Sequence, residues 1–192
     1  MKGFGAFDDV VIEYFDATAR KKHIFVQLKS KAKRHVTVSE LKSKNGDFGL
    51  HKYYESYIQV EKKFNCSEGG VKMDDRIDES LFIIYTNADV GRDLKSSKFV
   101  EFGETEFLMT GGSVLQFNEE EHPAIYEHLQ EMPKHREFLS RLRIYYSQAD
   151  EKRMDFYIKR ELQHSMKLPE SELDLSYVTY RDFIKDWWQN CN

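Results

Sequence analysis

Three polar residues within the first thirty positions have the side-chain types that phosphodiester chemistry requires. Asp9 precedes an apolar run, and Gln27 and Lys29 stand two residues apart in the next one. A carboxylate and an amide carbonyl are hard oxygen ligands that can supply part of the octahedral shell of Mg²⁺ or Mn²⁺, with water and phosphate filling the rest. A neighbouring lysine can position the attacking water or stabilise charge in the transition state. Asp9, Gln27 and Lys29, here called the polar trio, thus have the functional groups of a metal-dependent phosphodiester hydrolase.

The elements that must position the polar trio are two strands. Val10–Tyr14 and Ile24–Leu28 are β-branched and aromatic runs joined by a polar segment, which predicts a hairpin. A hairpin centred on Thr18 sets Asp9 opposite Gln27, and directly opposed residues point to the same side of a sheet. A slip of one residue would set Asp9 against Val26 and mix polar with apolar faces. Both strands are apolar on both faces, which predicts a sheet that is covered on both sides.

The rest of the chain predicts further strands and then helices. We expect a loop over 39–49, a helix from Leu50 to Phe64, a loop over 65–79 and a buried strand at Leu81–Thr86. Weaker strand patterns follow at 107–109 and 114–117, with Gly111-Gly112 as the turn between them. From Glu119 onward the apolar spacing is helical, with stripes that run through Ile125 and Leu129, Phe138, Leu142 and Tyr145, Met154 and Ile158, and finally Tyr177 to Trp187.

Composition places these elements in a globular protein of the mixed α/β class. The chain has 192 residues, and 40% of them are hydrophobic, which is enough for one substantial core. We expect an α/β core over 1–132 and a helical extension over 133–192. Cys66 and Cys191 provide neither a disulfide framework nor a metal-binding pair, which favours the cytoplasm or the nucleus. No apolar run has the roughly 20 residues that a membrane helix needs, and no signal peptide is apparent.

Charge limits how the chain could meet nucleic acid. The formal net charge is −4, so binding must come from a local patch and not from an overall basic excess. Such a patch begins at Lys29, and we expect Lys31, Lys33 and Arg34 to contact the phosphate backbone, preferably of DNA. The alternative interpretation of this basic run is an ordinary solvated surface.

The motifs around the polar trio resemble a known superfamily. Phe7-Asp8-Asp9-Val10-Val11-Ile12 followed by Ile24-Phe25-Val26-Gln27-Leu28-Lys29 is similar to the two core motifs of the PD-(D/E)XK nucleases. Together with Phe82-Ile83-Ile84-Tyr85-Thr86-Asn87, they resemble the nuclease-like N-terminal regions of large NACHT or ankyrin-repeat proteins, which belong to an innate-immunity-like multidomain class. The resemblance implies a restriction-endonuclease-like mixed β-sheet flanked by helices. It also implies Asp9 and Gln27 as ligands of Mg²⁺ or Mn²⁺, Lys29 as the catalytic lysine, and a place within a longer chain. The large apolar pair Trp187-Trp188 near the end leads to the same expectation of a longer chain.

One departure from the family pattern leaves two functions open. Many active members carry a glutamate on a helix upstream of the aspartate, whereas only eight residues precede Asp9 here. Glu13, near the turn, or Glu55, on the expected helix, could take its place. The first hypothesis is therefore a metal-dependent endonuclease acting on DNA. The alternative is a catalytically silent nuclease-like module that binds nucleic acid or protein. A pure assembly domain is a third reading, and a homodimer is compatible with each.

Histidines and glycines suggest no further chemistry. His122 and His128 lack the spacing and the third ligand of a helical zinc site, so we expect surface or packing roles for them. Gly69-Gly70 and Gly111-Gly112 lack the lysine of a phosphate-binding loop, which favours turns.

Overall fold

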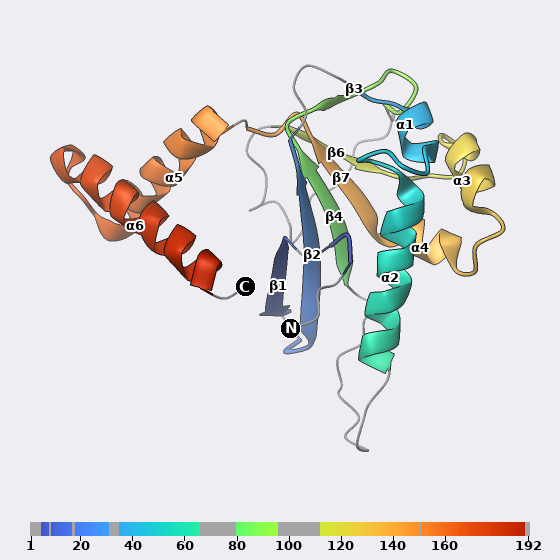
Figure 1. Ribbon diagram of the computed structural model, residues 1–192, viewed down its shortest axis with the longest axis horizontal. Helices are drawn as coiled ribbons and strands as arrows, with labels where there is room; N and C mark the ends of the chain where they lie inside the picture. The colour runs from blue at the N-terminus through green and yellow to red at the C-terminus, as the bar shows by residue number, and fades with distance from the viewer. Residues whose placement is uncertain are drawn as a thin grey trace. The chain divides into compact units, whose positions relative to one another are not determined.

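The main element of the fold is a mixed five-stranded sheet (Figure 1). The computed structural model describes residues 5–7, 9–16, 18–30, 35–65, 80–95, 112–149 and 151–190. The strand order is β1-β2-β4-β7-β6. The strands are β1 (Val10–Phe15), β2 (Lys21–Lys29), β4 (Leu81–Thr86), β7 (Leu142–Tyr146) and β6 (Ser113–Gln116). The three central strands β2, β4 and β7 are parallel, and β1 and β6 pair antiparallel at the two edges. The predicted α/β class is therefore correct, and the strands at 81–86 and near 114–117 are present.

The register of the first hairpin agrees with the sequence prediction. Val10 pairs with Val26 and Ile12 with Ile24. Alternation along β2 then sends Phe25, Gln27 and Lys29 to the same face. The turn between the strands is held by Asp16, whose carboxylate accepts hydrogen bonds from the main-chain N–H groups of Thr18 and Arg20 at 2.8 and 2.9 Å.

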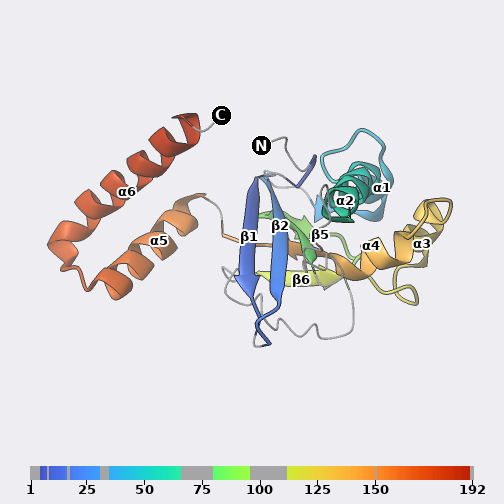
Figure 2. The same cartoon turned by 90° about the horizontal axis from the view of Figure 1, so that it is seen from below.

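Helices cover one face of the sheet. They are α1 (Val38–Lys42), α2 (Leu50–Asn65), α3 (Pro123–Leu129) and α4 (His135–Arg141), and both Figure 1 and Figure 2 show them gathered on the same side of the strands. Helix α2 confirms the helix predicted over Leu50–Phe64. A small parallel pair, β3 (His35–Val36) with β5 (Asp89–Val90), continues the chain beyond the ends of β2 and β4.

The main core lies between α2 and the sheet. Phe25 of β2 stacks on Phe82 of β4 at a ring-centroid distance of 5.1 Å, and Tyr57 of α2 meets Phe82 edge-on at 5.3 Å. All three side chains are fully buried. Each such aromatic ring buries a large apolar area, and offset and edge-on pairs add to that gain. This packing fixes α2 above the face of β2 that carries Phe25, Gln27 and Lys29.

Strand β1 corrects the expectation of a sheet covered on both sides. It is an edge strand, and Val10, Val11 and Phe15 are 40%, 40% and 68% exposed. The expectation holds for the next strand only as far as Val26: Ile24 and Val26 are buried, whereas Leu28 is 50% exposed. Apolar residues on both faces of a short run do not distinguish an edge strand from a central one, because the neighbours that bury it come from elsewhere in the chain.

The predicted boundary after residue 132 does not coincide with the division of the structure. The chain divides into two compact units, Met1–Gln148 and Ala149–Asn192. The reason is that the segment around Leu142, which we expected to continue a helical stripe from Phe138 to Tyr145, forms the strand β7 inside the sheet. In the predicted loop over 39–49, α1 occupies the first part, held by a capping box between Thr37 and Glu40.

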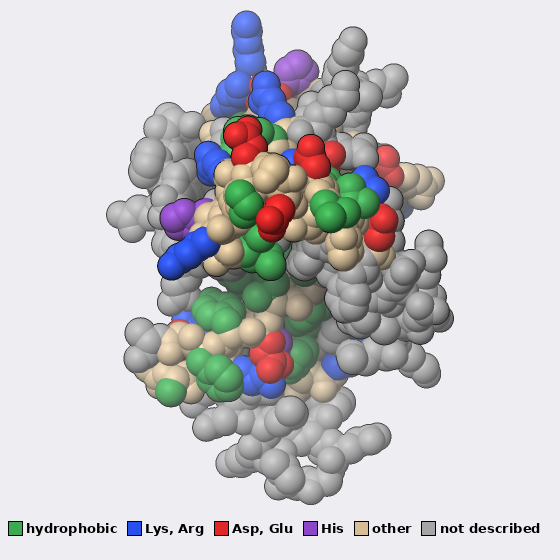
Figure 3. Space-filling model, turned by 90° about the vertical axis from the view of Figure 1, so that its left-hand side faces the viewer, with side chains coloured by type: hydrophobic (Ala, Val, Ile, Leu, Met, Phe, Trp, Pro, Cys, Tyr) green, Lys and Arg blue, Asp and Glu red, His purple; other side chains and the backbone are tan. Residues whose placement is uncertain are grey.

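The second unit is a pair of helices, α5 (Glu151–Met166) and α6 (Glu170–Asn190), as the helical spacing predicts. Lys159 of α5 forms an ion pair with Asp174 of α6 at 2.6 Å. Phe156 and Leu175 are exposed, and the face of the molecule in Figure 3 mixes apolar, acidic and basic side chains. None of the helices in the described ranges combines the length and the apolar character needed to cross a membrane.

Some predicted features fall outside the described residues. They are the basic residues Lys31, Lys33 and Arg34, the loop from residue 66 to 79, the strand at 107–109, the Gly69-Gly70 turn, and Gly111 of the second glycine pair. The side chains of Trp187 and Trp188 are likewise not described, although both residues lie within α6.

Candidate functional site

The polar trio lies at the carboxyl edge of the sheet. Strands β2, β4 and β7 are parallel, so their carboxyl ends meet at one edge, and the antiparallel β1 brings its amino end to the same place. Gln27 and Lys29 are at the end of β2, and Asp9 comes directly before β1. In open α/β sheets ligands bind outside the carboxyl ends of the strands. This edge is therefore where the topology alone would place a binding site.

Asp9 connects the two strands through its carboxylate. Its Oδ2 atom accepts a hydrogen bond from the main-chain N–H of Leu28 at 2.7 Å and another from the side-chain amide of Gln27. Asp9 lies just before β1, which begins at Val10. Its side chain, and not its main chain, accepts the hydrogen bond from the main-chain N–H of Leu28 in β2. The contact follows from the predicted register, since Asp9 and Gln27 are opposite each other.

Gln27 is buried, and only 7% of it is exposed. Its Nε2 atom donates to Asp9 and, at 3.3 Å, to the carbonyl of Leu28. A carboxylate can only accept hydrogen bonds, so the amide must turn its NH₂ group and not its oxygen toward Asp9. These bonds offset part of the penalty for burying the Gln27 amide.

The first turn of α2 completes the surroundings of the polar trio. Tyr53 is fully buried, with its ring centroid 5.1 Å from that of Phe7, and its hydroxyl donates to the carbonyl oxygen of Asp47 at 2.8 Å. The ammonium of Lys52 lies 5.1 Å from the centroid of the same Tyr53 ring. We call Asp9, Gln27, Lys29, Lys52 and Tyr53 the carboxyl-edge site.

The charges of Asp9 and Lys29 act on the two residues that α2 contributes to this site. Burial raises the pKa of the Tyr53 hydroxyl, and the carboxylates of Asp47 and Asp9 raise it further. Burial lowers the pKa of the Lys52 ammonium, the positive charge of Lys29 lowers it further, and Asp47 opposes both effects. Neither Lys29 nor Lys52 has a carboxylate within ion-pair distance in the described part of the chain.

The donor set fits a divalent metal only in part. Mg²⁺ is commonly held by one or two carboxylates together with water and substrate phosphates, so Asp9 with the carbonyl oxygen of Gln27 could contribute two ligands. However, it is the amide nitrogen of Gln27 that faces Asp9. Within the described ranges, no group of three or more His, Cys, Asp or Glu side chains could hold a metal ion. The metal roles of Asp9 and Gln27 therefore remain predictions.

Neither Glu13 nor Glu55, the two glutamates considered from the sequence, is brought to Asp9. Glu13 lies at the turn end of β1, where it pairs with Lys21 at 2.7 Å, and this hydrogen bond is the main reason that the pKa of Glu13 is lowered. Glu55 is exposed on α2 and lies 3.3 Å from the Nε2 atom of His51.

Sequence reasoning missed Lys52 and Tyr53. Their contribution depends on α2 packing with its first turn over the carboxyl edge, which is a long-range contact with no local signature. A weak signal is present in the helix itself, because its first turn contains no acidic residue, whereas acidic residues are common there.

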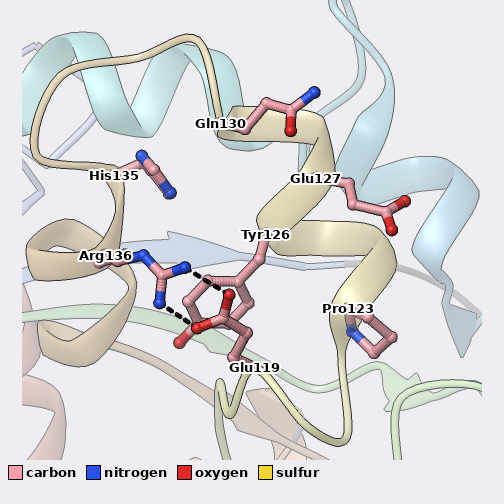
Figure 4. A pocket seen from close by; sticks show the side chains of 7 residues that line it. All are labelled: Glu119, Pro123, Tyr126, Glu127, Gln130, His135 and Arg136. Atoms are coloured by element: carbon pink, nitrogen blue, oxygen red, sulfur yellow. Dashed lines mark hydrogen bonds and ion pairs between the residues drawn. The ribbon is translucent and has the colours of Figure 1, made fainter.

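A cavity lies between α3 and α4 (Figure 4). This cavity of about 160 Å³ is lined by Glu119, Pro123, Tyr126, Glu127, Gln130, His135 and Arg136. Arg136 forms a two-fold ion pair with Glu119, one arm at 2.6 Å, and its guanidinium lies 6.0 Å from the Tyr126 ring centroid. The cavity is smaller than the roughly 300–1,000 Å³ typical of ligand pockets. The charges of Arg136 and Glu119 already neutralise each other, so this cavity is a weaker candidate for a ligand site than the carboxyl-edge site.

The two histidines singled out from the sequence differ in setting. His122 is buried before α3, and its two ring nitrogens are 3.2 Å from the carbonyl oxygens of Asn118 and Leu94, as expected of a packing residue. His128 is partly buried on α3. Burial lowers its pKa, and the charges of Lys42, His51 and Lys44 lower it further.

Comparison of the chain with models of protein families, with curated proteins and with solved structures found no match.

Proposed function

We propose that the carboxyl-edge site binds the phosphodiester backbone of nucleic acid, with DNA as the expected ligand, and that the chain is a nuclease-like module. The observation that carries this proposal is the convergence of Lys29 with Asp9 and Gln27 at the edge of the sheet where ligands bind in this class of fold. Lys29 supplies the positive charge that a phosphate attracts.

The hydrogen bonds of the site also favour binding of an anion. Oδ2 of Asp9 is occupied by two N–H donors, so part of its negative charge is already compensated by the protein. Lys29 has no such compensation from a carboxylate in the described residues. A phosphate beside Lys29 would fill that role, and phosphate contacts of this kind supply most of the affinity of sequence-independent nucleic-acid binding.

Metal-dependent phosphodiester hydrolysis is the second candidate, favoured by one specific observation. The side chains of Asp9 and Gln27 are hydrogen-bonded to each other, and Lys29 follows on the same face of β2. These are the carboxylate, amide and lysine that such chemistry uses. Asp9 and Gln27 are the residues that would hold Mg²⁺ or Mn²⁺, and the ion would supply Lewis acidity toward the phosphodiester. Lys29 would orient water or stabilise the developing charge.

A combined binding and cleavage experiment tests both candidates. Fluorescently labelled single-stranded and duplex oligonucleotides, as DNA and as RNA, are titrated with the protein in EDTA and in Mn²⁺, and the products are separated on a gel. We expect binding in EDTA that weakens with salt and is reduced in Lys29→Met. The matched control is Lys62→Met, an exposed lysine in the last turn of α2.

The outcomes separate the two functions. Binding in EDTA without cleavage in Mn²⁺ supports the silent module, whereas cleavage that is lost in Lys29→Met supports the hydrolase. If no oligonucleotide binds in either condition, or if Lys62→Met weakens binding as much as Lys29→Met, the proposed function is wrong.

A further inference from the structure

Two lysines from different elements belong to the carboxyl-edge site. Lys29 ends β2, and Lys52 lies in the first turn of α2. Each is partly buried, and neither has an ion-pair partner among the described residues. The carboxylate of Asp47 opposes the lowering of the Lys52 pKa without forming an ion pair with Lys52. Like charges in partly buried positions repel each other, and the charge of Lys29 contributes to the lowered pKa of Lys52, so this arrangement is unfavourable for the protein alone.

Lys52 is held in place by an aromatic anchor. The Tyr53 ring packs against Phe7, and its hydroxyl is fixed by the carbonyl of Asp47. The ammonium of Lys52 lies over this ring at 5.1 Å from its centroid. A cation over an aromatic face gains a modest electrostatic attraction without losing its charge. The ammonium therefore stays available to an external anion, and its position follows that of a buried ring.

We propose that Lys29 and Lys52 bind one phosphate group between them, so that Lys52 is a second phosphate-binding residue of the carboxyl-edge site. This inference rests on the proposed function and deepens it, since it assigns a phosphate of the nucleic-acid backbone to a particular pair of side chains. A phosphate has several oxygens and can accept from both ammonium groups at once. Burial first, and then the charge of Lys29, lower the pKa of Lys52. A bound phosphate anion would raise that pKa again.

The first test is a double-mutant cycle on oligonucleotide affinity in EDTA. Lys29→Met and Lys52→Met are each expected to weaken binding roughly tenfold or more, as for loss of one charge-assisted hydrogen bond. Because both lysines hold the same phosphate, the double variant should lose less than the product of the two single losses. Lys52→Arg keeps the charge and should restore most of the affinity, whereas Lys62→Met should change nothing. Circular dichroism and melting temperature establish that each variant is folded.

The second test does not require nucleic acid. The lysine ammonium groups are followed by NMR during pH titration, with and without inorganic phosphate. Lys52 should titrate below the ordinary range of a lysine, and its pKa should rise in Lys29→Met. Added phosphate should raise the pKa of Lys52 in the unsubstituted protein and much less in Lys29→Met.

These readouts distinguish failure of the inference from failure of the proposed function. The inference of a shared phosphate is wrong, even when nucleic acid binds, if phosphate leaves the titration of Lys52 unchanged. It is also wrong if the loss of affinity in the double variant equals the product of the losses in the two single variants. If phosphate moves Lys52 but no oligonucleotide binds, the two-lysine anion site stands and the nucleic-acid function is wrong.

Discussion

Two aspartates stand at the two ends of β1 and use their carboxylates differently. Asp16, in the hairpin turn, accepts from the N–H groups of Thr18 and Arg20 and from the Thr18 hydroxyl, and it pairs with Lys22 at 3.3 Å. Among the described residues, Asp9 at the carboxyl edge accepts from Gln27 and Leu28, both through Oδ2. One carboxylate is surrounded by protein donors, and the other has an oxygen with no protein partner in the described residues.

The contrast separates stabilisation from function. The bonds to Thr18, together with those to Arg20 and Lys22, lower the pKa of Asp16 well below its ordinary value. A carboxylate with several local donors of this kind defines a turn and has little capacity left for a ligand. Asp9 has fewer donors, a buried amide beside it and lysines nearby, so its remaining oxygen can still interact with a metal or water. The following predictions test this difference, beginning with the largest effect.

Asp9→Asn should have the largest effect on chemistry and little effect on binding. If the site hydrolyses phosphodiesters, cleavage in Mn²⁺ should fall roughly 100-fold or more, the loss expected when a group that supports transition-state charge is removed. Affinity for the oligonucleotide in EDTA should not fall, because a negative charge near the phosphate has been removed. The comparison is Asp16→Asn, which should leave both measurements unchanged. Cleavage that survives in Asp9→Asn would remove Asp9 from the hydrolytic role.

Gln27→Glu should make the free energy of unfolding depend on Mn²⁺. The change removes the amide donor to Asp9 and sets a second carboxylate beside it, so we expect a loss of about 1–3 kcal/mol in the free energy of unfolding in EDTA. Mn²⁺ should restore part of that loss, because a ligand that binds only the native state stabilises it.

The control for Gln27→Glu is Gln148→Glu. Gln148 is another buried glutamine, but its amide donates to the carbonyl of Tyr146 at 3.0 Å. This variant should also be destabilised, without rescue by Mn²⁺. Equal rescue of both variants would show that Mn²⁺ acts elsewhere and not at Asp9.

Asp16→Asn should have the smallest effect, a lowered melting temperature at neutral pH. The folded-state pKa of Asp16 is below its ordinary value of 3.8, so its stabilisation is present above that value and is lost as pH falls toward the folded pKa. The difference in melting temperature between the two proteins should therefore be constant near neutrality and narrow below about pH 4. Glu131→Gln, at an exposed position, serves as the control. A difference that does not change with pH would mean that the Asp16 charge does not stabilise the turn.

Local patterns were sufficient for the hairpin and α2 and insufficient for the rest of the site. The contact between Asp9 and Gln27 was predictable because strand alternation and the position of the turn determine the register. Strand β7 was not, since Leu142 and Tyr145 also fit helical spacing and only their neighbours in the sheet decide between the two. Lys52 was not predictable as a site residue, because its position depends on how α2 packs against Phe82 and Phe7.

The position of β2 has a consequence for the order in which parts of the site open. β2 is hydrogen-bonded on both sides, to β1 and to β4, and it carries Gln27 and Lys29. Asp9 belongs to the edge, where β1 has a single partner strand in the described sheet. Local opening should begin at such edges, where fewer bonds must break. Slow hydrogen exchange is thus expected for β2, which carries Lys29, and faster exchange for the amino end of β1 beside Asp9. A bound ligand should therefore slow exchange most clearly in β1.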